Sequence, residues 1–140
     1  MRIVVLCGRA NVGKTETLKQ LIAELLESGA QSTGNRLLIG GNDIVEVFLY
    51  NGLRVCVSTG GDAVEGGIEK AYELARHSSC DVFVTASRAS QNCETIEYVK
   101  KLGDYPIFLS AYAESGKDTD ERDLQGLAKR ARIDALLRCI

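Results

Sequence analysis

The feature that most constrains this chain is the run from Gly8 to Thr15, which reads Gly-Arg-Ala-Asn-Val-Gly-Lys-Thr. It follows a short apolar, β-branched segment at residues 2–7, which indicates a buried strand. Leucine and isoleucine then recur at helical spacing over residues 14–28, and Gly29 is placed to end that helix in a left-handed conformation. The run therefore forms a tight turn from a strand into a helix, which requires a fold that packs strands against helices.

The residue types in this turn suit it to phosphate. Backbone N–H groups from Asn11 to Thr15 point inward and form an anion nest at a helix N-terminus. Gly8 and Gly13 let the backbone approach an oxygen closely because they carry no Cβ. Lys14 reaches the β- and γ-phosphates of a nucleotide, and the hydroxyl of Thr15 is a ligand for Mg²⁺. The residues expected to bind the nucleotide here are Gly8, Asn11, Val12, Gly13, Lys14, Thr15 and Glu16.

With this pattern, the Walker A motif, the chain resembles the P-loop NTPase superfamily, specifically over residues 1–28 and beyond them by element order. The resemblance implies ATP, or another nucleoside triphosphate, and Mg²⁺ as cofactors. Residues 44–50 and 53–58 are rich in β-formers and enclose only Asn51-Gly52, the strongest short hairpin signal. Such a hairpin is similar to that of Ras-type GTPases, but the chain has no Asn-Lys-x-Asp motif with which GTPases read guanine.

The remaining apolar segments predict two further strands, at residues 80–86 and 107–112, and three further helices, at residues 63–77, 95–102 and 120–138. This order predicts one domain over residues 1–140 with a three-layer α/β/α P-loop NTPase fold. The sheet is expected to be mostly parallel and five-stranded, in the order 2-3-1-4-5. The strand before the phosphate loop is then central, and the hairpin supplies an antiparallel edge strand.

Residues 29–43 show no clear periodicity and are rich in Gly, Ser, Thr and Asn, which predicts a long loop. In GTPases the first switch follows the equivalent helix. On that reading Ser32 or Thr33 contacts Mg²⁺ and Arg36 contacts a phosphate. The alternative, which we favour, is a surface loop with no such role.

The strand at residues 53–57 ends at Ser58-Thr59-Gly60-Gly61-Asp62. In the superfamily this strand lies beside the phosphate-loop strand and delivers an Asp toward Mg²⁺. Here Ser58 occupies that position and Asp62 follows four residues later. Gly61 is expected to donate its N–H to the γ-phosphate, and Asp62 to hold Mg²⁺ through water or to orient an attacking water. The alternative role of Asp62 is to N-cap the next helix.

The polar stretch at residues 87–92 follows the strand at 80–86 and therefore lies on the ligand side of the sheet. Arg88 is its one strong cation, suited either to clamp phosphoryl charge with its bidentate fork or to face solvent. The predicted catalytic residues are thus Lys14, Asp62 and Arg88, and the predicted metal ligands are Thr15 and Asp62.

The overall composition limits the partners and the cellular compartment expected for this chain. A net charge of −2 and a pI of about 5.5 disfavour a large nucleic-acid footprint. No apolar run approaches the ~18 residues of a membrane span, and the first residues do not resemble a signal peptide. The five cysteines include no C-x-x-C pair, which favours a reduced, cytoplasmic chain. Lys129, Arg130 and Arg132 are interpreted as a solvated basic patch.

Three functions fit these observations. The first is a Mg²⁺-dependent ATPase or other NTPase that acts as a switch or a partner-regulated enzyme, with another protein or a second copy of the chain as partner. The second is a kinase that passes the γ-phosphate to a small molecule or nucleotide, although the chain leaves no room for a substrate cap. The third is a nucleotide-binding module that does not hydrolyse, since the Walker B region is atypical.

The missing Asn-Lys-x-Asp motif predicts that ATP is preferred over GTP, or that both bind weakly. Competition between the two nucleotides for the purified chain measures this preference. A preference for GTP of about tenfold, or 1.4 kcal/mol, would contradict the prediction and place the chain with the GTPases.

Overall fold

Six strands form one mixed sheet in the computed structural model, which describes residues 1–9, 12–61, 63–88, 93–102, 105–111 and 121–140. The strands are β1 (Arg2–Gly8), β2 (Gln31–Ile39), β3 (Asp43–Tyr50), β4 (Leu53–Ser58), β5 (Val82–Arg88) and β6 (Ile107–Ser110). Their order across the sheet is β2-β3-β4-β5-β1-β6. β1 pairs in parallel with both β5 and β6, and β3 alone among these six runs against the rest.

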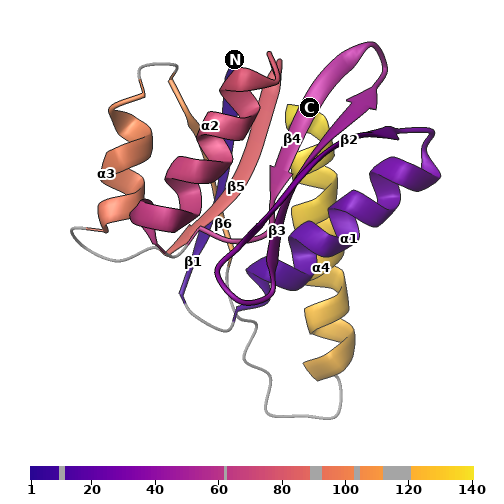
Figure 1. Cartoon of the computed structure of the whole chain (residues 1–140). Helices are drawn as coiled ribbons and strands as arrows, with labels where there is room; N and C mark the ends of the chain where they lie inside the picture. The colour runs from indigo at the N-terminus through magenta and orange to yellow at the C-terminus, as the bar shows by residue number, and fades with distance from the viewer. Residues whose placement is uncertain (10–11, 62, 89–92, 103–104, 112–120) are drawn as a thin grey trace.

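Helices cover both faces of this sheet (Figure 1). They are α1 (Lys14–Glu27), a π-helical turn η1 (Val64–Ile68), α2 (Glu69–His77), α3 (Glu94–Lys100) and α4 (Glu121–Cys139). α1 and α4 pack on one face, and η1, α2 and α3 pack on the other. None of the described helices combines the length and the apolar character needed to cross a membrane.

The alternating side chains of β1 join two separate hydrophobic cores. Val4 and Leu6 belong to the core under α1 and α4, whereas Ile3 and Val5 belong to the core under η1, α2 and α3. All four side chains are fully buried. Burial on both faces is typical of parallel strands between layers of helices. The predicted α/β class is therefore confirmed, with helices on both faces of a mostly parallel sheet.

The helix ends follow the sequence closely. α1 begins after Gly13, which has the left-handed φ of 86°, and ends before Gly29, whose φ is 96°. The N–H of Ala30 bonds to the carbonyl of Leu25 at 2.9 Å, which closes the last turn. The helix predicted at 63–77 is interrupted instead, because Gly66 has a φ of 75°. It begins at Val64 with Ala63 at the N-cap position, and Asp62, for which an N-cap was the alternative role, lies outside the described residues.

The prediction of a five-stranded sheet is wrong, because the structure has a sixth strand, β2. This strand lies within residues 29–43, where the sequence predicts a loop. These residues pair antiparallel with β3, with an irregularity between Ser32 and Arg36. The hairpin at Asn51-Gly52 is confirmed, but the antiparallel strand β3 is second from the edge and β2 is the edge strand. β2 was missed because most of its side chains are exposed, so no apolar alternation marks it as a strand.

The predicted strand order is also wrong. β4 does not lie beside β1, because β5 is inserted between them. β5 pairs with β1 along its whole length, from Arg2↔Val82 to Gly8↔Arg88, and with β4 over three residues. β1 and β5 are both buried on each face, so either pattern tolerates any interior position in the sheet. Lateral order depends on helix crossovers, which the pattern of buried residues does not encode.

Candidate functional site

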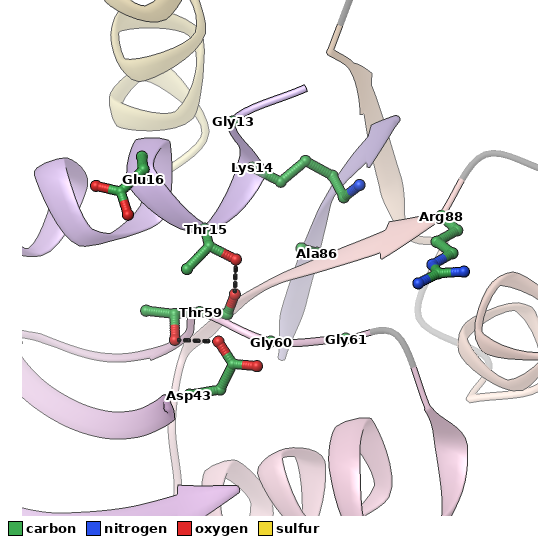
Figure 2. A pocket seen from close by; sticks show the side chains of 10 residues that line it. All are labelled: Gly13, Lys14, Thr15, Glu16, Asp43, Thr59, Gly60, Gly61, Ala86 and Arg88. Carbon is green, nitrogen blue, oxygen red and sulfur yellow. Dashed lines mark hydrogen bonds between the residues drawn. The ribbon is translucent and has the colours of Figure 1, made fainter. Parts of the chain in front are cut away.

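A cavity of about 410 Å³ lies where the start of α1 meets the carboxyl ends of β4 and β5 (Figure 2). In open α/β sheets this edge is where ligands bind. Its volume falls within the range of about 300–1,000 Å³ typical of small-molecule sites. Its lining residues are Gly13, Lys14, Thr15, Glu16, Asp43, Thr59, Gly60, Gly61, Ala86 and Arg88.

Lys14 is the most buried charged residue of the lining, with 7% of its surface exposed. Its Nζ donates hydrogen bonds to the carbonyl oxygens of Gly8 at 2.8 Å and Arg9 at 2.7 Å. The ammonium thus folds back over its own turn and lies beside the N-terminus of α1. Both the lysine charge and the helix dipole make this end of the cavity favourable for an anion.

Thr15 links the start of α1 to the end of β4. Its hydroxyl donates to the carbonyl oxygen of Thr59 at 3.3 Å, although the two residues are 44 positions apart in the chain (Figure 2). The contact forms even though β4 is not adjacent to β1. The first residue after β4 therefore meets the first turn of α1 directly.

That turn passes close to β5 at Gly61. A Cβ added to Gly61 would overlap the backbone carbonyl oxygen of Ala86, so only glycine fits between the two chains. The hydroxyl of Thr85 donates to the carbonyl of Gly60 at 3.1 Å and ties the same turn to β5 from inside the sheet. These contacts fix the backbone of Gly60 and Gly61 at the edge of the cavity.

Ser58 ends β4 at the position where the resemblance places a Walker B Asp. It is fully buried and its hydroxyl donates to the carbonyl of Gly60 at 2.8 Å, so it stabilises the turn from below. The side chain that reaches the cavity from this side is that of Asp43, whose Oδ1 accepts the hydroxyl of Thr59 at 3.1 Å. The sequence pattern predicts a loop up to Asp43 and indicates no role for it, whereas in the structure Asp43 is the first residue of β3.

Arg88 lies at the other side of the cavity, on the far side of Gly61 from Thr15 (Figure 2). It is the last residue of β5 and pairs in register with Gly8, so the segment after β1 and Arg88 leave the sheet at the same level. Among the described residues, the cavity lining thus includes two cations, Lys14 and Arg88, and two carboxylates, Glu16 and Asp43.

The structure brings most of the predicted site residues together. Gly13, Lys14, Thr15, Glu16, Gly61 and Arg88 line one cavity, and Gly8 binds the Lys14 ammonium through its carbonyl. Asn11 and Asp62 lie outside the described residues. The candidate switch residues of β2 do not line the cavity: Ser32 and Arg36 contact Glu46, and Thr33 contacts Val47.

The interpretation of the basic residues on α4 as a solvated patch holds for Arg130 but is wrong for Arg132. Arg130 is exposed and pairs with Glu24 and Asp134. Arg132 is partly buried, and its Nη1 donates to the carbonyl oxygen of Val12 at 2.8 Å. It thereby joins the last helix to the backbone just before α1. Helical spacing gives no sign of this contact, because Arg132 lies 120 positions from Val12.

Comparisons of the chain with protein-family models, with curated proteins and with solved structures found no significant match. The functional argument therefore depends on the residues and geometry of the site itself.

The close approach at Gly61 predicts that Gly61→Ala pushes the turn after β4 away from β5. Overpacking of this kind costs about 1–3 kcal/mol in the free energy of unfolding. Gly41→Ala is the matched control, because a Cβ there meets no atom within 4 Å. Urea denaturation of both variants measures the difference, and equal stabilities would contradict the described contact.

The thiol of Cys93 is held by the hydroxyls of Thr95 and of Ser87, the residue before Arg88 in β5. Partial burial raises the pKa of Cys93, but hydrogen bonds from the Thr95 hydroxyl, the Ile96 N–H and Ser87 outweigh it and lower the pKa to about 7. Burial raises the pKa of Cys7 to about 11.

Because the thiolate is the reactive form and accumulates above the pKa, alkylation of Cys93 by iodoacetamide should rise between pH 6 and pH 8, with a midpoint near 7. Cys7 should remain mostly unmodified over that range. Mass spectrometry of peptides after timed alkylation measures both rates, and Cys93→Ser identifies the fast site. A flat rate for Cys93 below pH 8 would contradict the prediction.

Proposed function

We propose that this chain is a P-loop protein that binds a nucleoside triphosphate with Mg²⁺ and hydrolyses it, with ATP preferred. The observation that carries the proposal is the placement of Lys14 and Thr15 of the Gly8–Thr15 motif. Both line a cavity at the carboxyl edge of the sheet, at the N-terminus of a helix that follows a buried strand. That is the structural context the motif requires for binding phosphate.

In this proposal the triphosphate lies along the start of α1. The first backbone N–H groups of a helix have no acceptor within the helix and are therefore available to phosphate oxygens. Lys14 releases the carbonyls of Gly8 and Arg9 and turns its ammonium to the β- and γ-phosphates. Its burial strengthens that attraction, since the surroundings screen charge less than water does.

Mg²⁺ fits the oxygen donors present at the site. The hydroxyl of Thr15 and the carboxylate of Asp43 are hard oxygen ligands, and Mg²⁺ is typically held by one or two such groups together with phosphates and water. When bound, the ion supplies charge neutralisation to the β- and γ-phosphates. Thr15 holds it from the phosphate-loop side.

The transferred phosphoryl group would meet the turn after β4 and the end of β5. The N–H of Gly61 is fixed at that edge and donates to a γ-phosphate oxygen. Arg88 contributes a guanidinium whose planar fork matches phosphoryl oxygens. Asp62, the next residue after Gly61, is the predicted group that orients the attacking water. Turnover that persists at the wild-type rate in Asp62→Asn would assign that role elsewhere.

A phosphoryl transferase is the second candidate, and one observation favours it. A smaller cavity of about 210 Å³ adjoins the first and shares Asp43, Gly60 and Gly61 with it. A small acceptor there would lie next to the γ-phosphate. Release of inorganic phosphate without any acceptor identifies the hydrolase. Nucleotide bound with negligible phosphate release identifies the transferase or the non-hydrolysing module, and addition of candidate acceptors then separates those two.

The proposal predicts that Lys14→Ala abolishes ATP binding, because the charge that balances the β- and γ-oxygens is lost. The fold should survive, since the Lys14 ammonium contacts loop carbonyls rather than core side chains. Lys19→Ala is the matched control: Lys19 lies on the same helix but is exposed and pairs with Glu16 at 3.7 Å. Titration with a fluorescent ATP analogue in the presence of Mg²⁺ measures both. Wild-type affinity in Lys14→Ala would overturn the proposed site.

A further inference from the structure

We propose that Asp43 is the carboxylate that faces the metal ion in this site, in place of the Asp that the superfamily carries at the end of the strand corresponding to β4. The inference rests on the proposed function, because it assigns a residue to the Mg²⁺ side of the nucleotide site. Two observations support it: β3 begins at the ligand edge of the sheet, and Thr59 holds the Asp43 side chain by a hydrogen bond.

The reversed direction of β3 brings Asp43 to the ligand edge. The five other strands leave the sheet at that edge by their carboxyl ends, but β3 runs antiparallel to β2 and β4 and enters there. Val45 is the partner of Ser58, the last residue of β4, so Asp43 lies beyond that end of the strand. An antiparallel neighbour thus supplies an acid at the level where β4 itself carries only Ser58.

The Asp43 carboxylate is oriented by Thr59. The fully buried Thr59 donates its hydroxyl to Oδ1 at 3.1 Å, and that hydroxyl accepts the N–H of Ile44 at 3.0 Å. Across the same residue, the carbonyl of Thr59 accepts the hydroxyl of Thr15 at 3.3 Å. Thr15, Thr59 and Asp43 therefore form a continuous hydrogen-bonded line from the phosphate loop to the acid (Figure 2).

The second oxygen of Asp43 has room because residue 60 is glycine. A Cβ at Gly60 would lie 2.6 Å from Oδ2 and 2.9 Å from the Asp43 Cβ, closer than real atoms approach. Among the described residues, Oδ2 accepts no hydrogen bond, so it remains available to a cation. The missing Cβ of Gly60 thus leaves space for the Asp43 carboxylate, just as the missing Cβ of Gly61 leaves space for the carbonyl of Ala86.

The other carboxylate of the described lining does not fill this role. Glu16 has a side chain that is 68% exposed and pairs with Lys19, and it is directed away from Thr59 (Figure 2). Ser58 is turned toward the backbone of Gly60. Asp43 is therefore the acid that shares a hydrogen-bonded line with Thr15, the hydroxyl through which the Walker A motif binds Mg²⁺.

The test measures how strongly Mg²⁺ and nucleotide help one another to bind. The dissociation constant of a fluorescent ATP analogue is determined with excess Mg²⁺ and with EDTA, for the wild type and for Asp43→Asn. In parallel, Mn²⁺ is titrated into the nucleotide complex and its bound fraction is followed by electron paramagnetic resonance. Glu46→Gln is the matched control, because it removes a carboxylate from the same strand, where Glu46 contacts Ser32 and Arg36.

We expect Asp43→Asn to weaken Mn²⁺ binding by about 10–100-fold, the range typical when a group that supports a metal site is lost. The affinity for nucleotide in EDTA should stay within a few-fold of the wild type, and Glu46→Gln should match the wild type in both measurements. Asn still accepts the Thr59 hydroxyl, so the fold should persist. Asp43→Ser, also neutral and able to accept that bond, takes its place if Asp43→Asn does not fold.

The outcomes separate the two proposals. If the wild type binds no nucleotide with or without metal, the proposed function fails and this inference fails with it. If the wild type binds nucleotide and metal and the neutral variant binds Mn²⁺ equally well, the nucleotide site stands and the assignment of Asp43 is wrong. If neither neutral variant folds, Asp43 is a structural residue and the assignment is likewise wrong.

Discussion

Burial of β1 and β5 on both faces is the constraint on which the rest of this structure depends. Their interior side chains are almost fully excluded from water, so helices must cover the sheet on each side. Polar backbone and charged side chains can then gather only where these strands end. Gly8 and Arg88 end paired strands at the same level, so the loop and the arginine emerge together. The cavity lies at that edge because the layers of helices leave it open.

A second constraint is the direction of β3. Because β3 runs against its neighbours, the edge at which the parallel strands end also receives the start of an antiparallel strand. The cavity is consequently built from four segments: the first turn of α1, the turn after β4, the end of β5 and Asp43. Thr59, in the turn after β4, connects this turn to two of the other segments. Its carbonyl accepts the Thr15 hydroxyl of α1, and its hydroxyl donates to the Asp43 carboxylate.

The insertion of β5 between β1 and β4 changes how the site is assembled relative to the expected order. In the predicted arrangement the end of β4 would flank the phosphate loop directly. In the observed one, Thr15 bonds to Thr59 directly after β4, and the next two residues, Gly60 and Gly61, then run against the end of β5. That course brings Gly60 against the Asp43 side chain and Gly61 against the carbonyl of Ala86, which explains why two consecutive glycines are needed there.

The sequence by itself determined the strand-to-helix turn at Gly8–Thr15, the ends of α1, the hairpin at Asn51-Gly52 and the α/β class. Each of these is encoded by local spacing or by a residue that a local backbone conformation requires. Only the tertiary structure decided the strand order, the pairing of β2, the presence of Asp43 in the same cavity as Lys14 and Thr15, and the bond from Arg132 to Val12. Those features depend on contacts between residues far apart in the chain. An exposed edge strand leaves no apolar alternation, and nothing in the spacing of a polar residue tells which distant backbone group it will meet.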